Sequence, residues 1–296
     1  MIFDSSRDAV YRPSSKPVFE GFEKLPVFDP TQIGYCAANV WWLSQAAHLA
    51  YFEEADVDQQ LHRVGWKLVR FFEERNLPAH QRSTEGFLAT ADRFAVLSFR
   101  GTESTHLPDL KSDAQLRLVA LARGTRARVH VGFLKALDEV WGGVDEELAR
   151  LAENNIPVWY TGHSLGAALA TVAASRRPPR QLVTFGSPRV GDEGFSRTLE
   201  KVSVLRITNC CDGVAAVPPP VFYCHVGQQY HFDHAGRCCP NPSLACLLRS
   251  KFWGTWEYHL TCPWFRRKNV AARFLMDHAI VNYGHLLAHQ HSLGGK

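Results

Sequence analysis

The chain has 296 residues, of which 46% are apolar and 21% are charged, an ordinary balance for a globular protein. This composition excludes a collagen-like, disordered or coiled-coil chain. The 33 basic and 29 acidic residues leave a net charge of only +4, which does not predict nucleic acid as a partner.

The predicted elements alternate between helices and short apolar strands. After an irregular, proline-containing arm over residues 1–32, helical spacing of apolar residues is expected over residues 37–60, 61–74, 133–154, 165–175 and 270–289. Short apolar runs predict strands over residues 85–91, 94–99, 128–132, 156–161, 181–185 and 203–208. The pattern predicts one α/β domain over residues 33–296, with a mostly parallel central sheet flanked by helices.

The sequence shows no pattern of export or membrane insertion. Its N-terminus lacks the basic start and apolar stretch of a secretory signal, and the longest apolar region, residues 33–52, is interrupted by polar side chains. We therefore expect a cytoplasmic protein. Peripheral membrane association, or export without an N-terminal signal, are the alternatives.

The strongest motif is the run Gly162-His163-Ser164-Leu165-Gly166, placed between a predicted strand and a predicted helix. In such a G-x-S-x-G turn the strained serine projects its hydroxyl above the sheet, and the flanking glycines let the backbone turn tightly. The first N–H of the helix, that of Leu165, can then stabilise an oxyanion. The motif predicts a nucleophile at Ser164, whereas the alternative is a serine that only caps the helix.

Six segments in order resemble the class 3 lipase family, the fungal triacylglycerol lipase type of α/β-hydrolase. YTGHSLGAALATVAA, at residues 160–174, is similar to the nucleophile segment of that family. The other segments are VLSFRGT (96–102), VHVGF (129–133), TFGSPRVGD (184–192), LRITNCCDGVAAVP (205–218) and DHAIVNY (277–283). The resemblance implies an α/β-hydrolase fold and cleavage of carboxylic esters of lipids.

A serine nucleophile needs a base and an acid that orients the base. In this fold class the chain order is serine, acid, histidine, which Asp212 and His278 satisfy at the positions that resemble those of the family. Asp233 and His285 are the alternatives. His163 is expected to support the turn.

The resemblance also implies an oxyanion loop and a lid. Thr102 matches the family's oxyanion position and would act with the Leu165 N–H. Residues 103–118 occupy the place of the lid, but they lack the aromatic residue that the family often has there. This difference favours weak interfacial activation and leaves a smaller-substrate esterase open.

Residues 230–267 are expected to form an insertion rich in cysteine and aromatic residues. Its cysteines fit no paired metal-binding template, so free thiols, one or two disulfides and a metal site all stay open. Aromatic and basic residues alternate near its end, as in segments that dock on a bilayer. The candidate docking residues are Phe252, Trp253, Trp256 and Trp264.

These observations predict a serine hydrolase with a triacylglycerol lipase-like activity and no cofactor or metal. A phospholipase A1 and a short-chain carboxylesterase are the enzymatic alternatives. A non-catalytic relative that binds lipid or protein is the alternative of another class.

Overall fold

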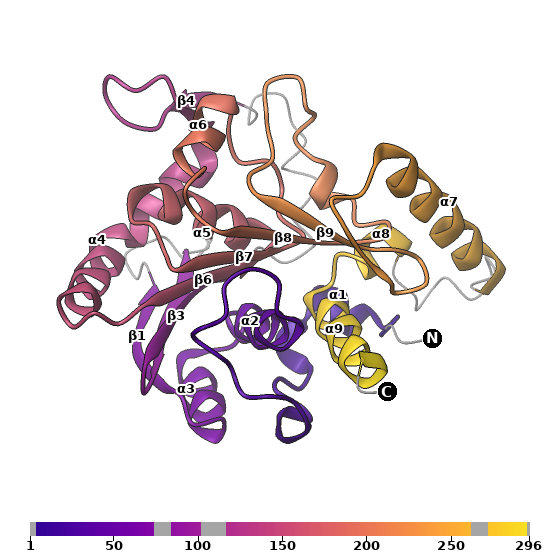
Figure 1. The fold of residues 1–296 in the computed structure, drawn as a ribbon, viewed down its shortest axis with the longest axis horizontal. Helices are drawn as coiled ribbons and strands as arrows, with labels where there is room; N and C mark the ends of the chain where they lie inside the picture. The colour runs from indigo at the N-terminus through magenta and orange to yellow at the C-terminus, as the bar shows by residue number, and fades with distance from the viewer. Residues whose placement is uncertain (1–3, 74–83, 102–116, 262–271, 295–296) are drawn as a thin grey trace.

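An eight-stranded sheet runs through the centre of the protein in the computed structural model (Figure 1), which describes residues 4–73, 84–101, 117–261 and 272–294. The strand order is β1-β2-β3-β6-β7-β8-β9-β10. The five central strands, β3 to β9 in that order, are parallel, and the outer strands on both sides are antiparallel. The prediction of a mostly parallel central sheet is confirmed.

The strands are short, between three and seven residues long. The sheet consists of β1 Lys67–Glu73, β2 Glu85–Ala91, β3 Phe94–Phe99, β6 Val158–His163, β7 Gln181–Phe185, β8 Val204–Asn209, β9 Gln228–Phe232 and β10 Cys238–Pro240. A separate antiparallel pair consists of β4 Leu118–Ala120 and β5 Arg128–His130.

Helices cover both faces of the sheet (Figure 1). On one face lie α1 Arg7–Tyr11, α2 Ala37–Leu49, α3 Glu54–Arg63 and α9 Ile280–Gly294. On the other face lie α4 Val131–Glu153, α5 Leu165–Arg176 and α6 Glu193–Thr198. The helix α7 Leu244–Thr261 and the short α8 Arg273–Met276 stand beyond the β8–β9 side of the sheet.

Each face of the sheet carries its own apolar core because side chains alternate along a strand. On β6, Trp159 packs with the α2 side and Tyr160 packs with the α4–α5 side. On β8, Leu205 and Ile207 belong to the first core and Val204 to the second. The central strands are thus buried on both faces, as expected for a parallel sheet.

The N-terminal residues are part of this packing. Phe19 and Phe28 are buried among the indole rings of Trp41, Trp42 and Trp66, with ring centroids 5.5–6.4 Å apart. The arm therefore closes the first core instead of lying loosely on the surface.

Three of the predicted elements are corrected by the structure. The helix predicted over residues 61–74 is wrong, because α3 ends at Arg63 and residues 67–73 pair with β2 as an edge strand. The helix predicted over residues 37–60 is two helices, broken between Leu49 and Glu54. The last helix is likewise broken, into α8 and α9.

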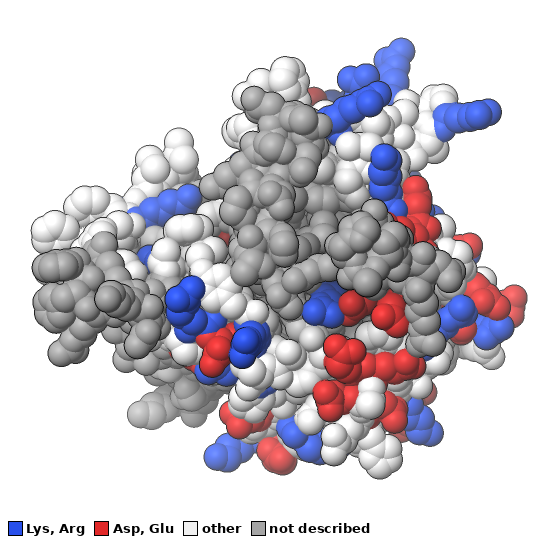
Figure 2. All heavy atoms as spheres, turned by 180° about the vertical axis from the view of Figure 1, so that it is seen from behind, with Lys and Arg blue, Asp and Glu red and all other residues white. Residues whose placement is uncertain are grey.

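The surface carries charges of both signs (Figure 2). Basic side chains gather at the end of the molecule that carries β4 and β5, where the exposed arginines are Arg117, Arg123, Arg126 and Arg128. No helix in the described part of the chain has the length and apolar character needed to cross a membrane.

Candidate active site

Ser164 stands at the junction of β6 and α5 in a strained conformation, with φ 56° and ψ −122°. Such a backbone costs about 1–3 kcal/mol and is held only where the surroundings impose it. Its hydroxyl is buried, does not cap α5 and has no hydrogen-bond partner among the described residues. The alternative of a simple capping serine is therefore wrong, and the hydroxyl is free to react.

The two glycines of the motif make this turn possible. A Cβ on Gly162 would collide with the backbone of Gly166, and a Cβ on Gly166 would collide with the carbonyl of Phe99. All of these partners are backbone atoms that cannot swing away. The next residue, Leu165, begins α5, where the first backbone N–H groups have no partner within the helix and can face an anion.

Asp212 and His278, which are 66 positions apart in the sequence, form a buried hydrogen-bonded pair. The Nδ1 of His278 lies 3.0 Å from each carboxylate oxygen of Asp212. The backbone N–H of Val214 and the hydroxyl of Tyr283 also donate to this carboxylate, at 2.8 and 2.6 Å. Burial alone raises the pKa of Asp212, but the charge and the hydrogen bonds of His278, with the bond from Tyr283, hold it below its usual value. The acid is therefore a carboxylate poised to orient an imidazole.

Ser164 and His278 both lie beside the carboxyl end of β7. The backbone N–H of Ser164 donates to the carbonyl of Phe185 at 3.0 Å. The next residue, Gly186, touches the imidazole, because a Cβ built there would lie 2.9 Å from the Nδ1 of His278. The Nε2 of His278 is buried and, like the hydroxyl of Ser164, has no partner among the described residues.

His163 holds the backbone of His278. Its Nε2 lies 2.6 Å from the carbonyl of His278, so this nitrogen carries the proton and donates. Its Nδ1 accepts from the hydroxyl of Tyr51 at 2.7 Å. Burial, reinforced by His278, lowers the pKa of His163 well below its usual value, so the ring stays neutral. This arrangement agrees with the expected supporting role of His163.

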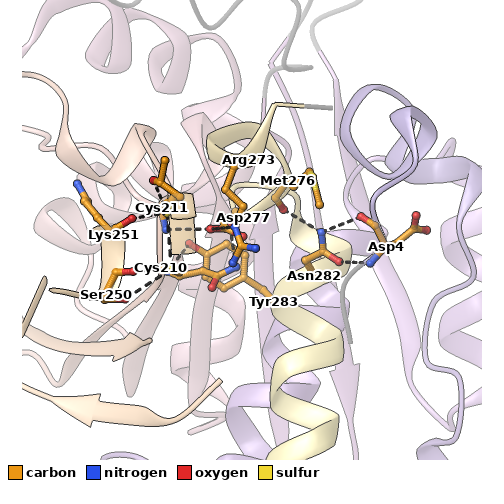
Figure 3. Close-up of polar contacts among 12 residues, drawn as sticks. Asp4, Cys210, Cys211, Ser250, Lys251, Arg273, Met276, Asp277, Asn282 and Tyr283 are labelled. Atoms are coloured by element: carbon orange, nitrogen blue, oxygen red, sulfur yellow. Dashed lines mark hydrogen bonds and ion pairs between the residues drawn. The ribbon is translucent and has the colours of Figure 1, made fainter. Parts of the chain in front are cut away.

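A second buried network fixes the segment just before the histidine (Figure 3). The Oδ2 of Asp277 accepts from the Nε of Arg273 at 2.8 Å and from the backbone N–H of Cys211 at 2.9 Å. The side chain of Asn209 donates to the carbonyl of Asp277 at 3.0 Å. These contacts join the end of β8, which precedes the acid, to the break between α8 and α9, which holds the base.

The structure brings Ser164, Asp212 and His278 to one place, with Leu165 beside the nucleophile. Asp233, the alternative acid, instead pairs with Arg237 at 2.8 Å. His285, the alternative base, is exposed on α9. Thr102, Trp264 and all but the last two residues of the expected lid lie outside the described residues.

Sequence reasoning missed the residues that support the acid and the base. Tyr283 lies five positions after His278, inside the DHAIVNY segment, so its spacing on the helix could have indicated it. Tyr51 is 112 positions from His163 and no local pattern connects the two. Asp277 precedes the histidine and pairs with Arg273 four positions earlier, a charge spacing that the sequence could have indicated.

One group of described side chains offers donor atoms close enough to share a metal ion. The thiols of Cys210 and Cys211 and the carboxylate of Asp277 lie within 4.8 Å of one another. The carboxylate already binds the guanidinium of Arg273, a cation that would repel a metal. Each described cysteine of the insertion, and of this group, is a free thiol.

Comparisons with known proteins agree on one family. The family described as lipase (class 3) matches residues 96–222. The chain is 36% identical over 155 residues to the chloroplastic phospholipase A(1) DAD1 of Arabidopsis thaliana, covering 43% of this chain and 34% of that protein. It is 40% identical over 114 residues to the secreted mono- and diacylglycerol lipase 1 of Fusarium solani, covering 36% of this chain and 34% of that protein. The chain thus spans about a third of the length of these two curated relatives.

A solved structure supports the same fold. The triacylglyceride lipase of Rhizomucor miehei superimposes with a TM-score of 0.56 at 21% identity, over 71% of this chain and 86% of that chain. The prediction of an α/β-hydrolase fold is confirmed. The cytoplasmic location stays a prediction, since one matched relative is named as chloroplastic and another as secreted.

Proposed function

We propose that the chain is a serine hydrolase that cleaves carboxylic esters of lipids, and the match of the lipase (class 3) family to residues 96–222 supports this proposal. One observation carries the proposal. The buried, unpartnered hydroxyl of Ser164 sits on a strained turn beside the Asp212–His278 pair, whose outer nitrogen is also unpartnered among the described residues.

In the proposed reaction, Ser164 attacks the ester carbonyl while the Nε2 of His278 takes its proton. Asp212 stabilises the imidazolium, and the N–H of Leu165 stabilises the oxyanion. The imidazolium then protonates the leaving alcohol, and an acyl group stays on Ser164. Water, activated by the same imidazole, releases the acid and restores the serine. Thr102 is proposed as the second oxyanion donor, on the strength of its position in the sequence.

The names of the relatives support a lipid ester as the substrate. One is named as a phospholipase A1 and another as a mono- and diacylglycerol lipase. We therefore keep a phospholipase A1 as the second candidate, beside the triacylglycerol lipase-like activity. A short-chain carboxylesterase is the third enzymatic outcome that the substrate panel below separates.

An apolar stripe on α7 supports contact with a lipid surface. Every fourth residue of this helix is a large apolar side chain between 54% and 71% exposed: Leu244, Leu248, Phe252, Trp256 and Leu260. The opposite side of α7 is buried against the body through Ser250, Gly254 and Tyr258. Trp253 lies beside the stripe, with its ring centroid 5.4 Å from that of Phe252. An exposed aromatic stripe with Arg249 and Lys251 at its flank suits the headgroup zone of a bilayer.

The activity is tested with p-nitrophenyl esters of two to sixteen carbons, with and without phospholipid or triolein emulsions. Wild type is compared with Ser164→Ala, and both are labelled with an alkyl-phosphonate probe. Turnover and labelling that disappear in Ser164→Ala are expected, with a preference for long acyl chains. Absence of labelling in folded wild type would leave a non-catalytic lipid- or protein-binding relative.

The membrane contact is tested separately by flotation with phospholipid vesicles. Trp256→Ser is expected to reduce binding about tenfold, because it removes a large interfacial side chain. Val27→Ser, which removes an exposed apolar side chain from the N-terminal arm, is the control and is expected to bind as wild type. Equal binding by both variants would contradict the docking role of α7.

A further inference from the structure

A small cavity of about 220 Å³ lies between β8, β9 and α7, next to Asp212. Neither Ser164 nor His278 lines it. Cavities that hold drug-sized molecules measure about 300–1,000 Å³, so this one suits a single compact group.

Arg206 gives the cavity its chemistry. Its side chain lines the cavity and is 7% exposed. Among the described residues, its Nε has no hydrogen-bond partner, and its Nη2 donates only to the side-chain oxygen of Gln229, at 3.3 Å. No described carboxylate pairs with it. A buried guanidinium without an anion is strongly destabilising, so this arrangement indicates a negatively charged group that completes the site.

One carboxylate does border the cavity, that of Asp212. Its oxygens accept from His278, Tyr283 and Val214, and none is bonded to Arg206. This carboxylate therefore belongs to the proposed acid–base pair and leaves the guanidinium unneutralised.

Two further cations border the same cavity. Arg189 donates to the backbone carbonyls of Ala216 and Pro218, which are neutral acceptors. Lys251 joins the neighbouring network through its backbone carbonyl, and its side chain points away from Cys211 (Figure 3). Within the described residues, neither Arg189 nor Lys251 forms a salt bridge. Burial lowers the pKa of Arg206 to about 10, with the nearby positive charge of Arg189 adding to the effect.

We propose that this cavity binds a phosphate group, held by Arg206 with Lys251 and Arg189. Three cations against one engaged carboxylate favour a multiply charged anion, and the planar fork of arginine matches the oxygens of a phosphate. Leu244, Leu247 and Leu248 of α7 form the apolar border of the cavity. The phosphate can therefore enter free from solution or as the headgroup of a lipid whose chains follow the α7 stripe.

The binding is measured without ester turnover, so its failure is separate from a failure of the proposed hydrolase. Inorganic phosphate is titrated calorimetrically into the full chain at constant ionic strength. In a second arm the chain is floated with vesicles in which both the phosphatidylcholine and the phosphatidic acid are ether-linked, so that the vesicles contain no carboxylic ester to cleave. Vesicles with an equal charge supplied by oleate are the comparison.

Lys251→Gln is paired with Arg249→Gln, which removes one positive charge from the same helix outside the cavity. Lys251→Gln is expected to weaken phosphate binding about tenfold and Arg249→Gln to leave it unchanged. Arg206→Gln is expected to abolish binding, and circular dichroism checks its fold. If Arg206→Gln does not fold, the Lys251 and Arg249 pair decides.

The two arms identify the source of the phosphate. Saturable binding of inorganic phosphate, sensitive to Lys251→Gln alone, supports a site for the free anion. Binding confined to phosphatidic acid vesicles, with the same sensitivity, supports a lipid headgroup. The proposal is overturned if neither form binds, if oleate vesicles bind equally well, or if the two glutamine variants lose binding to the same extent.

Discussion

The hydroxyl of Tyr283 connects the acid of the proposed triad to the end of β8. It donates to the Oδ2 of Asp212 at 2.6 Å and accepts from the backbone N–H of Asn209 at 3.1 Å. Tyr283→Phe keeps the ring and removes both bonds. A hydrogen bond to a charged group contributes about 1.5–3 kcal/mol, and a buried N–H left without an acceptor costs about 1–3 kcal/mol. The free energy of unfolding is therefore expected to fall by about 2.5–6 kcal/mol.

The same change is expected to act on catalysis. The hydroxyl helps to hold the pKa of Asp212 down, so its loss raises that pKa and moves the acid limb of the pH–rate profile to higher pH. If the less well oriented imidazole raises the activation free energy by about 1.4 kcal/mol, kcat falls about tenfold. The assay is hydrolysis of a soluble p-nitrophenyl ester from pH 4 to 9, with thermal unfolding of the same samples.

Tyr160→Phe is the matched control, because it removes the same atom from a buried tyrosine of β6 in the second core. It is expected to leave the pH profile unchanged. The reasoning is refuted if Tyr283→Phe and Tyr160→Phe agree within about twofold in kcat and share one acid limb.

Three further predictions follow from contacts described above. His163→Phe is expected to lower kcat by about 10–100-fold, because the carbonyl of His278 loses its donor. An unchanged kcat would show that the backbone of His278 needs no support. Gly166→Ala is expected to lower the free energy of unfolding by more than about 3 kcal/mol, while Gly142→Ala, whose Cβ meets open space on α4, is expected to be neutral or stabilising. Similar thermal unfolding of these two variants would contradict the steric argument. Burial lowers the pKa of both His48 and His231 to about 4, so the protein is most stable above about pH 6.5, where both rings are neutral in the folded and unfolded states. Toward pH 4 each histidine is expected to lower the free energy of unfolding by up to about 3 kcal/mol, because the unfolded chain binds the proton more tightly. A free energy of unfolding by denaturant that is constant from pH 7 to 4 would contradict this prediction.

The centre of the fold was predictable because local and long-range preferences agree there. The run before Ser164 is apolar and β-branched or aromatic, the two glycines permit the turn, and small residues follow in α5. Each choice favours the same strand, turn and helix. The proposed nucleophile could therefore be placed from fifteen consecutive residues, YTGHSLGAALATVAA.

The edge strand β1 was not predictable because its local pattern and its long-range pairing disagree. In Lys67–Glu73 the apolar residues Leu68, Phe71 and Phe72 have the spacing of a helix face. As an edge strand, this segment is half-exposed on both faces, so it lacks the alternation that marks a strand. Its structure is decided by pairing with β2, a contact that no local pattern encodes.

The candidate site likewise contains residues that the sequence could predict and residues that it could not. The order of Ser164, Asp212 and His278 could be taken from a resemblance, because each lies in a segment with a recognisable pattern. The partner Tyr51 could not, since it acts through a single buried contact with His163, 112 positions away in the sequence. The break between α8 and α9 was missed because the apolar spacing continues across Asp277 and His278. Buried polar contacts at these residues, such as that of the Asp277 carbonyl with Asn209, interrupt the helix instead.

The pairing of Asp4 with Asn282 has a consequence for biosynthesis. The backbone N–H of Asp4 donates to the side-chain oxygen of Asn282 at 2.7 Å, across 278 positions, on the helix that follows the base. Asn282 is synthesised 278 positions after Asp4, and contacts this distant in sequence form late. By then β3, β6, β7 and β8 have been translated, with Ser164 and Asp212 among them. The nascent chain therefore carries the proposed nucleophile without the proposed base, and the proposed active site is complete only when synthesis has passed α8.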